Sequence, residues 1–152
     1  MIYKMNLQFV FSYLGILPYI FILIDRFFLY RIKIEFILEF TLYYTLIIIV
    51  FIGSINWNLK KNISTIASVL GVLPSIFAVF IISLNLINFN KIFLFIFLCI
   101  FLVIQLIGDY FFVFKEKKYK KIFYFLRFPL TIFIIFSYFL ILVSIEPISK
   151  FA

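Results

Sequence analysis

Five long apolar runs, separated by short polar connections, constrain the fold of this 152-residue chain more than any other feature. A helix needs about 20 apolar residues to cross a hydrocarbon core of about 30 Å, and each run approaches or exceeds that length. We therefore predict an all-α integral membrane bundle of five transmembrane helices, forming a single transmembrane domain over residues 1–152. The predicted spans cover about residues 7–24, 34–57, 63–86, 92–114 and 122–145.

The composition supports lipid as the main solvent and excludes several classes of protein. Hydrophobic residues make up 67% of the chain and charged residues 13%, whereas soluble domains are about half apolar and a quarter charged. The chain has no His and a single Cys, Cys99, which excludes an internal disulfide, a Cys zinc site and His-based chemistry. We expect no metal and no cofactor. We attribute the net charge of +8 to membrane topology rather than nucleic-acid binding.

Basic residues in short loops predict the orientation of the spans. With five spans, nine of the 14 Lys and Arg residues fall on the side of the N-terminus, and the other five fall on the opposite side. This bias predicts that the N-terminus lies inside and the C-terminus outside.

An internal repeat joins the first and third runs. Residues 12–21 and 68–77 are identical at seven of ten positions, and Gly53 and Gly108 are spaced almost equally in the next runs. This pattern predicts a repeated helical hairpin, formed by spans one and two and again by spans three and four, with a fifth helix added. Convergence on the same packing needs remains an alternative explanation.

Small residues along these runs predict close contact between helices, because they let backbones approach each other in lipid. A ligand site along the same stripe is the alternative that the sequence leaves open. Pro18 and Pro74 are expected to kink their two helices alike. The residues assigned to helix packing are Ser12, Gly15, Pro18, Gly53, Ser64, Ser68, Gly71, Pro74, Ser75 and Gly108.

A polar cluster is predicted near the N-terminal side of the membrane. Asp109 and Arg127 each lie six residues from the same basic loop, so they sit at matched depth in an antiparallel hairpin and should pair. Gln105 lies one turn from Asp109, and Asn56 and Trp57 end the second run on the same side. The cluster is either a binding pocket or ion vestibule, or a neutralised pair that locks spans four and five together.

Glu39 is a further ionisable group, near the opposite face of the membrane. It follows Arg31 and Glu35 at four-residue spacing, which predicts a ladder of charges along one helix face. An acid–base pair of the two carboxylates is the alternative interpretation.

These motifs, in this order, resemble an inner-membrane family found in proteobacteria and in mitochondria as transmembrane protein 69. The matching segments are Leu14 to Tyr19, Phe51 to Asn58, Ser68 to Ser75, Gln105 with Asp109, and Phe123 with Leu126, Arg127, Pro129 and Thr131. Ser54, Asn56 and Asn58 depart from the family pattern, so a ligand contact there would differ. The resemblance implies about five spans in a bacterial or mitochondrial inner membrane, with the N-terminus in the cytoplasm or matrix. It implies no activity, substrate or cofactor.

Our leading hypothesis from the sequence is a non-enzymatic integral membrane protein that supports or assembles other inner-membrane components. It rests on very short loops, on small-residue packing faces and on the missing catalytic constellation. The alternative is a small transporter or an ion- or proton-translocating protein that uses the polar cluster. An enzyme acting on lipid ranks lowest, since no nucleophile with a base is found. The expected partners are the lipid bilayer, other inner-membrane proteins or a second copy of the chain.

Overall fold

The structure is a computed structural model that describes residues 7–55, 65–113, 120 and 123–144. These residues form helices and no strand, and three of the helical segments are short π-helical turns, labelled η. The elements are α1 (Leu7–Leu14), α2 (Leu17–Ile24), η1 (Asp25–Leu29), α3 (Ile34–Ile55), α4 (Thr65–Leu86), α5 (Lys91–Gly108), η2 (Asp109–Val113), η3 (Phe123–Arg127) and α7 (Phe128–Val143).

Five of the described helical stretches are long and apolar enough to cross a membrane, which confirms the predicted fold class and multi-pass architecture. Their bounds lie within five residues of the predicted spans, and the first stretch both begins and ends five residues later than predicted. The predicted end of span two and start of span three fall within residues 56–64, outside the described residues. The apolar stretches are Ser12–Leu29, Ile34–Gly53, Ser68–Leu86, Lys91–Phe112 and Phe123–Val143.

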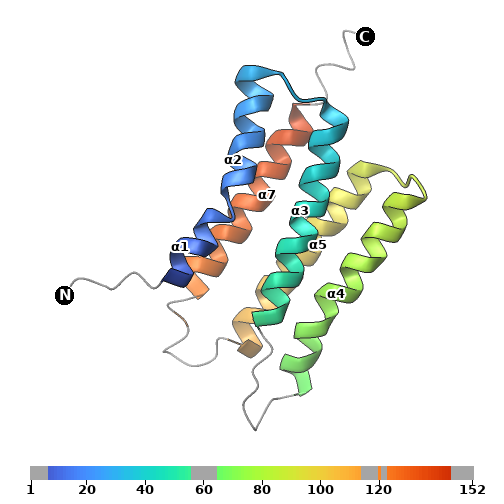
Figure 1. The fold of residues 1–152 in the computed structure, drawn as a ribbon. Coiled ribbons are helices and arrows are strands. Elements are labelled where there is room, and N and C mark those ends of the chain that lie inside the picture. The colour runs from blue at the N-terminus through green and yellow to red at the C-terminus, as the bar shows by residue number, and fades with distance from the viewer. Residues whose placement is uncertain (1–6, 56–64, 114–119, 121–122, 145–152) are drawn as a thin grey trace, which may run out of the picture.

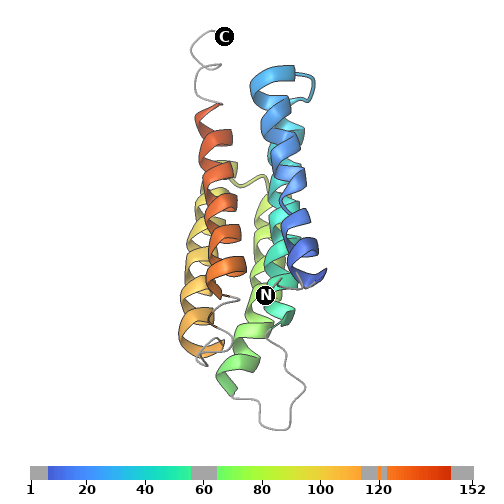
Figure 2. The same cartoon turned by 90° about the vertical axis from the view of Figure 1, so that its left-hand side faces the viewer.

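The helices run side by side in two layers, one made of α2, α3 and α4 and the other of α5 and α7 (Figures 1 and 2). The first helix, α1, begins at one end of the bundle, and α7 ends at the other (Figure 1). The core lies between the layers, where Ile49, Leu98 and Ile134 are almost completely buried. This core joins α3, α5 and α7, so it holds the fourth and fifth spans together beside the predicted polar cluster.

Gly53 of α3, which the sequence assigns to helix packing, lies in close contact with α4. A methyl group added to Gly53 of α3 would lie 2.5 Å from Cγ of Pro74 and 3.1 Å from the carbonyl oxygen of Gly71, both in α4. Gly108 of α5 also faces α4, where an added methyl would lie 3.1 Å from Cδ2 of Leu70. Both glycines of the sequence repeat therefore contact the same helix, rather than one helix in each hairpin.

Replacing Gly53 by Ala is expected to lower the free energy of unfolding by about 1–3 kcal/mol, because the methyl group overlaps a rigid proline ring and backbone. The measurement is thermal unfolding of the purified protein in detergent. Gly108→Ala is the matched control, with a smaller expected loss because the flexible end of Leu70 can move aside. Equal losses in the two variants would contradict the close contact at Gly53.

The prediction that Pro18 and Pro74 kink their helices alike is wrong. Pro18 lies in the first turn of α2, after a turn at Gly15 and Ile16 that separates α2 from α1, whereas α4 remains helical through Pro74. The two prolines differ because their surroundings differ. The ring of Pro74 fits against Gly53, while the break before Pro18 is held from another helix.

The break in the first span is held by a tyrosine of α3. The N–H of Tyr19 donates to the carbonyl of Ile16 at 3.0 Å, which leaves the carbonyl of Gly15 outside the regular helical pattern. The hydroxyl of Tyr44 donates to that carbonyl at 2.9 Å. A backbone acceptor freed inside a membrane must be satisfied by protein, so Tyr44 stabilises the turn.

Two of the predicted packing serines do not pack. Ser68 and Ser75 are exposed, whereas Gly71, Pro74 and Ala78 are buried. The buried face of α4 is centred between Pro74 and Ala78, so the serines lie at its edge and turn outward. Ser12 is partly buried, and Ser64 lies outside the described residues.

Candidate functional site

The predicted ion pair between spans four and five is present. Asp109 opens the π-helical turn that continues α5, and Arg127 closes the π-helical turn that leads into α7. Nε and Nη2 of Arg127 each lie 2.5 Å from Oδ2 of Asp109. The pair joins two neighbouring helices at the end of the bundle where α1 begins (Figure 1).

The pair is buried inside the bundle rather than placed at its surface. Asp109 is 1% exposed and Arg127 is 7% exposed. An isolated ionised side chain within a membrane costs roughly 3 kcal/mol or more. Each residue is therefore tolerated at this position because the other neutralises it.

Three buried polar atoms beside the pair lack hydrogen-bond partners. They are Nε2 and Oε1 of Gln105 and Nη1 of Arg127, and they complete the set of such atoms found among the described residues. Gln105 lies one turn before Asp109 in α5 and is 4% exposed. Leaving a buried polar group unpaired costs about 1–3 kcal/mol. We call Gln105, Asp109 and Arg127 the charged cluster.

Aromatic rings from η2 and η3 contact one another next to the charged residues in sequence. The ring of Tyr110 lies 5.3 Å from that of Phe123 and 6.5 Å from that of Tyr124, measured between centroids. Nζ of Lys120 lies 5.9 Å from the centroid of Tyr110, within the range of a cation–π contact. In sequence, these residues are nearer the connection between spans four and five than the ion pair is.

The remaining predicted members of the polar cluster, Asn56 and Trp57, lie outside the described residues. The structure adds Thr131, which the sequence did not single out. Thr131 is 2% exposed, and its hydroxyl donates to the carbonyl of Arg127 at 3.0 Å. It thus supports the backbone that carries the guanidinium.

A second buried polar network joins α2, α3 and α7 and was missed in the sequence. The hydroxyl groups of Tyr19 and Thr45 lie 2.6 Å apart, and the Tyr138 hydroxyl also donates to Thr45. Thr45 in turn donates to the carbonyl of Thr41 at 2.7 Å. Uncharged Tyr and Thr residues merge into apolar runs, and the four-residue spacing of Thr41 and Thr45 was the available signal.

A third buried polar group lies at the opposite end of the bundle, where the sequence predicts only a connection. Asp25 is 2% exposed and accepts a hydrogen bond from the N–H of Ile32 at 3.0 Å. Arg26 is 8% exposed, and its Nε donates to Oγ of Ser144 at 2.8 Å. Its Nη2 donates to the carbonyl of Ser144. Arg26 thus binds the C-terminal end of α7, where a cation is favoured.

All the buried charged residues described here lie in π-helical turns. Asp25 and Arg26 lie in η1, Asp109 in η2 and Arg127 in η3. Such turns are rare and occur frequently at functional sites. Their coincidence with the charged cluster favours a role for the cluster beyond packing.

The predicted charge ladder of Arg31, Glu35 and Glu39 is wrong. Helix α3 begins at Ile34, so Arg31 precedes it and cannot continue its face. Glu39 instead pairs with Lys91 of α5, with Nζ and Oε1 3.0 Å apart. This pair is largely exposed, at 33% for the Lys91 side chain and 53% for that of Glu39.

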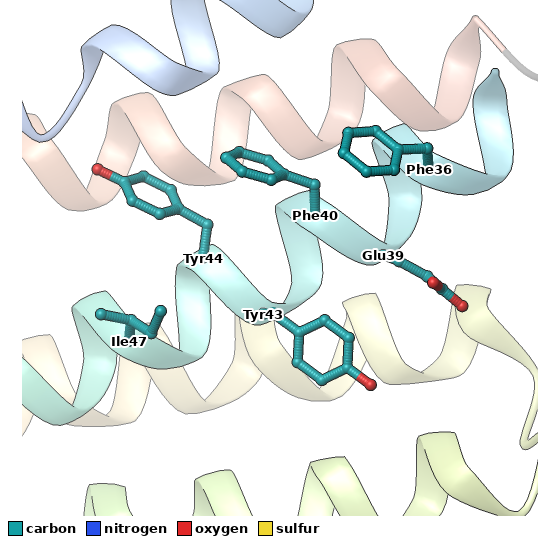
Figure 3. A pocket seen from close by; sticks show the side chains of 6 residues that line it. All are labelled: Phe36, Glu39, Phe40, Tyr43, Tyr44 and Ile47. Carbon is teal, nitrogen blue, oxygen red and sulfur yellow. The ribbon is translucent and has the colours of Figure 1, made fainter. Parts of the chain in front are cut away.

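A shallow pocket of about 280 Å³ lies on the outward face of α3 (Figure 3). The rings of Phe36 and Phe40 stack at 6.1 Å, and those of Phe40 and Tyr44 at 5.7 Å. The pocket is lined by Phe36, Glu39, Phe40, Tyr43, Tyr44 and Ile47. All six residues come from one helix, so this is an apolar face open to lipid or to another helix.

Among the described residues, no group of three or more His, Cys, Asp or Glu residues could hold a metal ion. Comparison of the chain with models of protein families, with curated proteins and with solved structures found no match.

Proposed function

We propose that this chain is a small membrane transport protein that binds a polar solute or ion at the charged cluster. The observation that carries the proposal is the gathering of unpaired atoms of Gln105 and Arg127 beside the buried pair. A pair that only locked two helices would not require an unpaired amide next to it, since that amide destabilises the fold. Ionisable residues inside membrane spans commonly mark solute or proton pathways.

The position of the charged cluster supports access from one side of the membrane. Asp109 lies near the end of the fourth span, and Arg127 near the start of the fifth. Beyond them toward the other face, the core residues Leu98, Leu102 and Ile134 are apolar and buried. A solute would reach the cluster from the nearer face and cross the apolar core only after a change in helix packing.

The test is the swelling of liposomes that contain the purified protein in iso-osmotic ammonium lactate, potassium chloride with a potassium ionophore, or glycerol, followed by light scattering. We expect faster swelling than in protein-free liposomes with at least one solute, and an at least tenfold loss of the difference in Gln105→Leu. Asn85→Leu is the control, because Asn85 bonds Tyr43 at the opposite end of the bundle. Equal rates with and without protein for all three solutes would refute transport.

The second candidate function is the support or assembly of other membrane proteins, and the outward face of α3 favours it. This face exposes stacked rings, with Phe36 60% and Phe40 38% exposed, beside the pocket of Figure 3. Purification in mild detergent tests it. Recovery of one defined membrane protein, lost in Phe36→Ala/Phe40→Ala but kept in the control Phe136→Ala/Phe139→Ala on α7, would support assembly. Recovery of the chain alone would oppose it.

We also propose in which membrane the chain lies and on which side its N-terminus is found. The motif order supports an inner membrane, bacterial or mitochondrial, and membership of the family that includes transmembrane protein 69. The nine basic residues on the N-terminal side support an N-terminus in the cytoplasm or matrix. A reporter fused to the C-terminus that is active only outside the cytoplasm tests the orientation in bacteria, where we expect it to be active.

A further inference from the structure

We infer that the solute bound at the charged cluster is a small carboxylate, and that it binds together with one proton that Asp109 takes up. This inference rests on the proposed transport function. It names the chemical class of the solute and the ion that accompanies it. Two independent features of the cluster lead to it, namely the unpaired hydrogen-bonding groups and the balance of charge.

The unpaired groups of the charged cluster are mainly donors. Nη1 of Arg127 and Nε2 of Gln105 each carry two N–H bonds, whereas Oε1 of Gln105 is the single unpaired acceptor atom. A ligand that satisfies them must present several acceptor oxygens. A guanidinium binds planar carboxylates particularly well, because its N–H bonds match both oxygens.

The balance of charge requires a proton to accompany the anion. In the structure, Asp109 neutralises Arg127 through Nε and Nη2. A bound carboxylate would add one uncompensated negative charge in a buried site, at a cost of several kcal/mol. If Asp109 binds a proton, its carboxylate becomes a neutral carboxyl group, and the carboxylate ligand then neutralises Arg127. One anion and one proton enter together, so binding leaves the total charge of the site unchanged.

Asp109 is the only carboxylate among the described residues of the elements around the charged cluster. Tyr13, Tyr110, Lys120 and Tyr124 are the titratable residues described on α1, η2, η3 and the segment between the last two. The helix α4, which packs against η2, contributes none within Thr65–Leu86. The proton is therefore assigned to Asp109.

The experiment measures ligand binding and proton uptake by the whole chain in detergent, with formate, lactate and succinate as probes. Calorimetry gives Kd, and a pH dye in weak buffer counts protons. In the wild-type protein we expect at least one of these carboxylates to bind, with about one proton taken up per anion. We also expect Kd to rise about tenfold per pH unit above neutral pH. Asp109→Asn should bind the anion without proton uptake, and Arg127→Gln should not bind it.

The wild-type measurement decides the inference even if a variant does not fold. Binding of a carboxylate without proton uptake overturns the coupling to Asp109. Binding of potassium or glycerol, with no binding of the three carboxylates, overturns the solute class but leaves the transport function standing. Absence of binding by all probes, together with liposome swelling no faster than without protein, refutes both and leaves water as the partner of Gln105.

Discussion

Replacing Asp109 by Asn is expected to lower the free energy of unfolding by about 3–5 kcal/mol, because the guanidinium of Arg127 then stays buried without its counter-charge. Arg127→Gln should cost a similar amount for the opposite reason. The double variant should lose clearly less than the sum of the two, since it buries two neutral groups that can hydrogen-bond each other. Unfolding by heat or denaturant in detergent micelles measures all three.

The exposed ion pair of Glu39 and Lys91 is the matched control for this cycle. It also joins two helices, with its atoms 3.0 Å apart, but both side chains are partly exposed. Exposed pairs contribute about 0–1 kcal/mol, so Glu39→Gln should change stability little. A double variant at Asp109 and Arg127 as unstable as the sum of the single variants would contradict the pairing.

The ion pair could be predicted from the sequence because its geometry depends on only two regular quantities. Helix rise sets the depth of a residue below a loop, and an antiparallel hairpin brings equal depths together. Asp109 and Arg127 each lie six residues from the same connection. The helical rise per residue and the antiparallel direction of the two spans were enough to predict the pair, without knowledge of how the hairpin packs on other helices.

Features that depend on how the helices pack sideways could not be predicted in this way. The burial of Asp25 and Arg26 requires the end of α7 to lie against the first span. The contact between Gly53 and Pro74 depends on α3 and α4 being neighbours in one layer. The repeat suggested a different pairing of helices, because identical segments say nothing about which neighbour each one meets.

The unpaired state of Gln105 also depends on packing, since sequence spacing places it beside Asp109 but cannot show whether its amide finds a partner. The same spacing fits an amide bonded to the Asp109 carboxylate and an amide left unbonded. In the structure both ends of the amide are unpaired. The side chain of Gln105 therefore distinguishes a structural ion pair between spans four and five from a ligand-binding site.

Replacing Gln105 by Leu is expected to raise the free energy of unfolding by about 1–3 kcal/mol while abolishing solute binding and transport. The stability should rise because the variant removes a buried amide that lacks partners and puts an apolar side chain of similar length in its place. Function should be lost because the variant removes a donor and the only unpaired acceptor of the charged cluster. Thermal unfolding and the liposome assay measure the two effects on the same preparation.

Thr131→Val is the matched control, because Thr131 is as buried as Gln105 but its hydroxyl is already bonded to the carbonyl of Arg127. It should lower the free energy of unfolding by about 0.5–1.5 kcal/mol. If the free energy of unfolding rises in Gln105→Leu and falls in Thr131→Val, Gln105 serves binding and Thr131 serves stability. If Gln105→Leu also destabilises the protein, the amide has a structural partner, and the cluster is a lock between spans four and five.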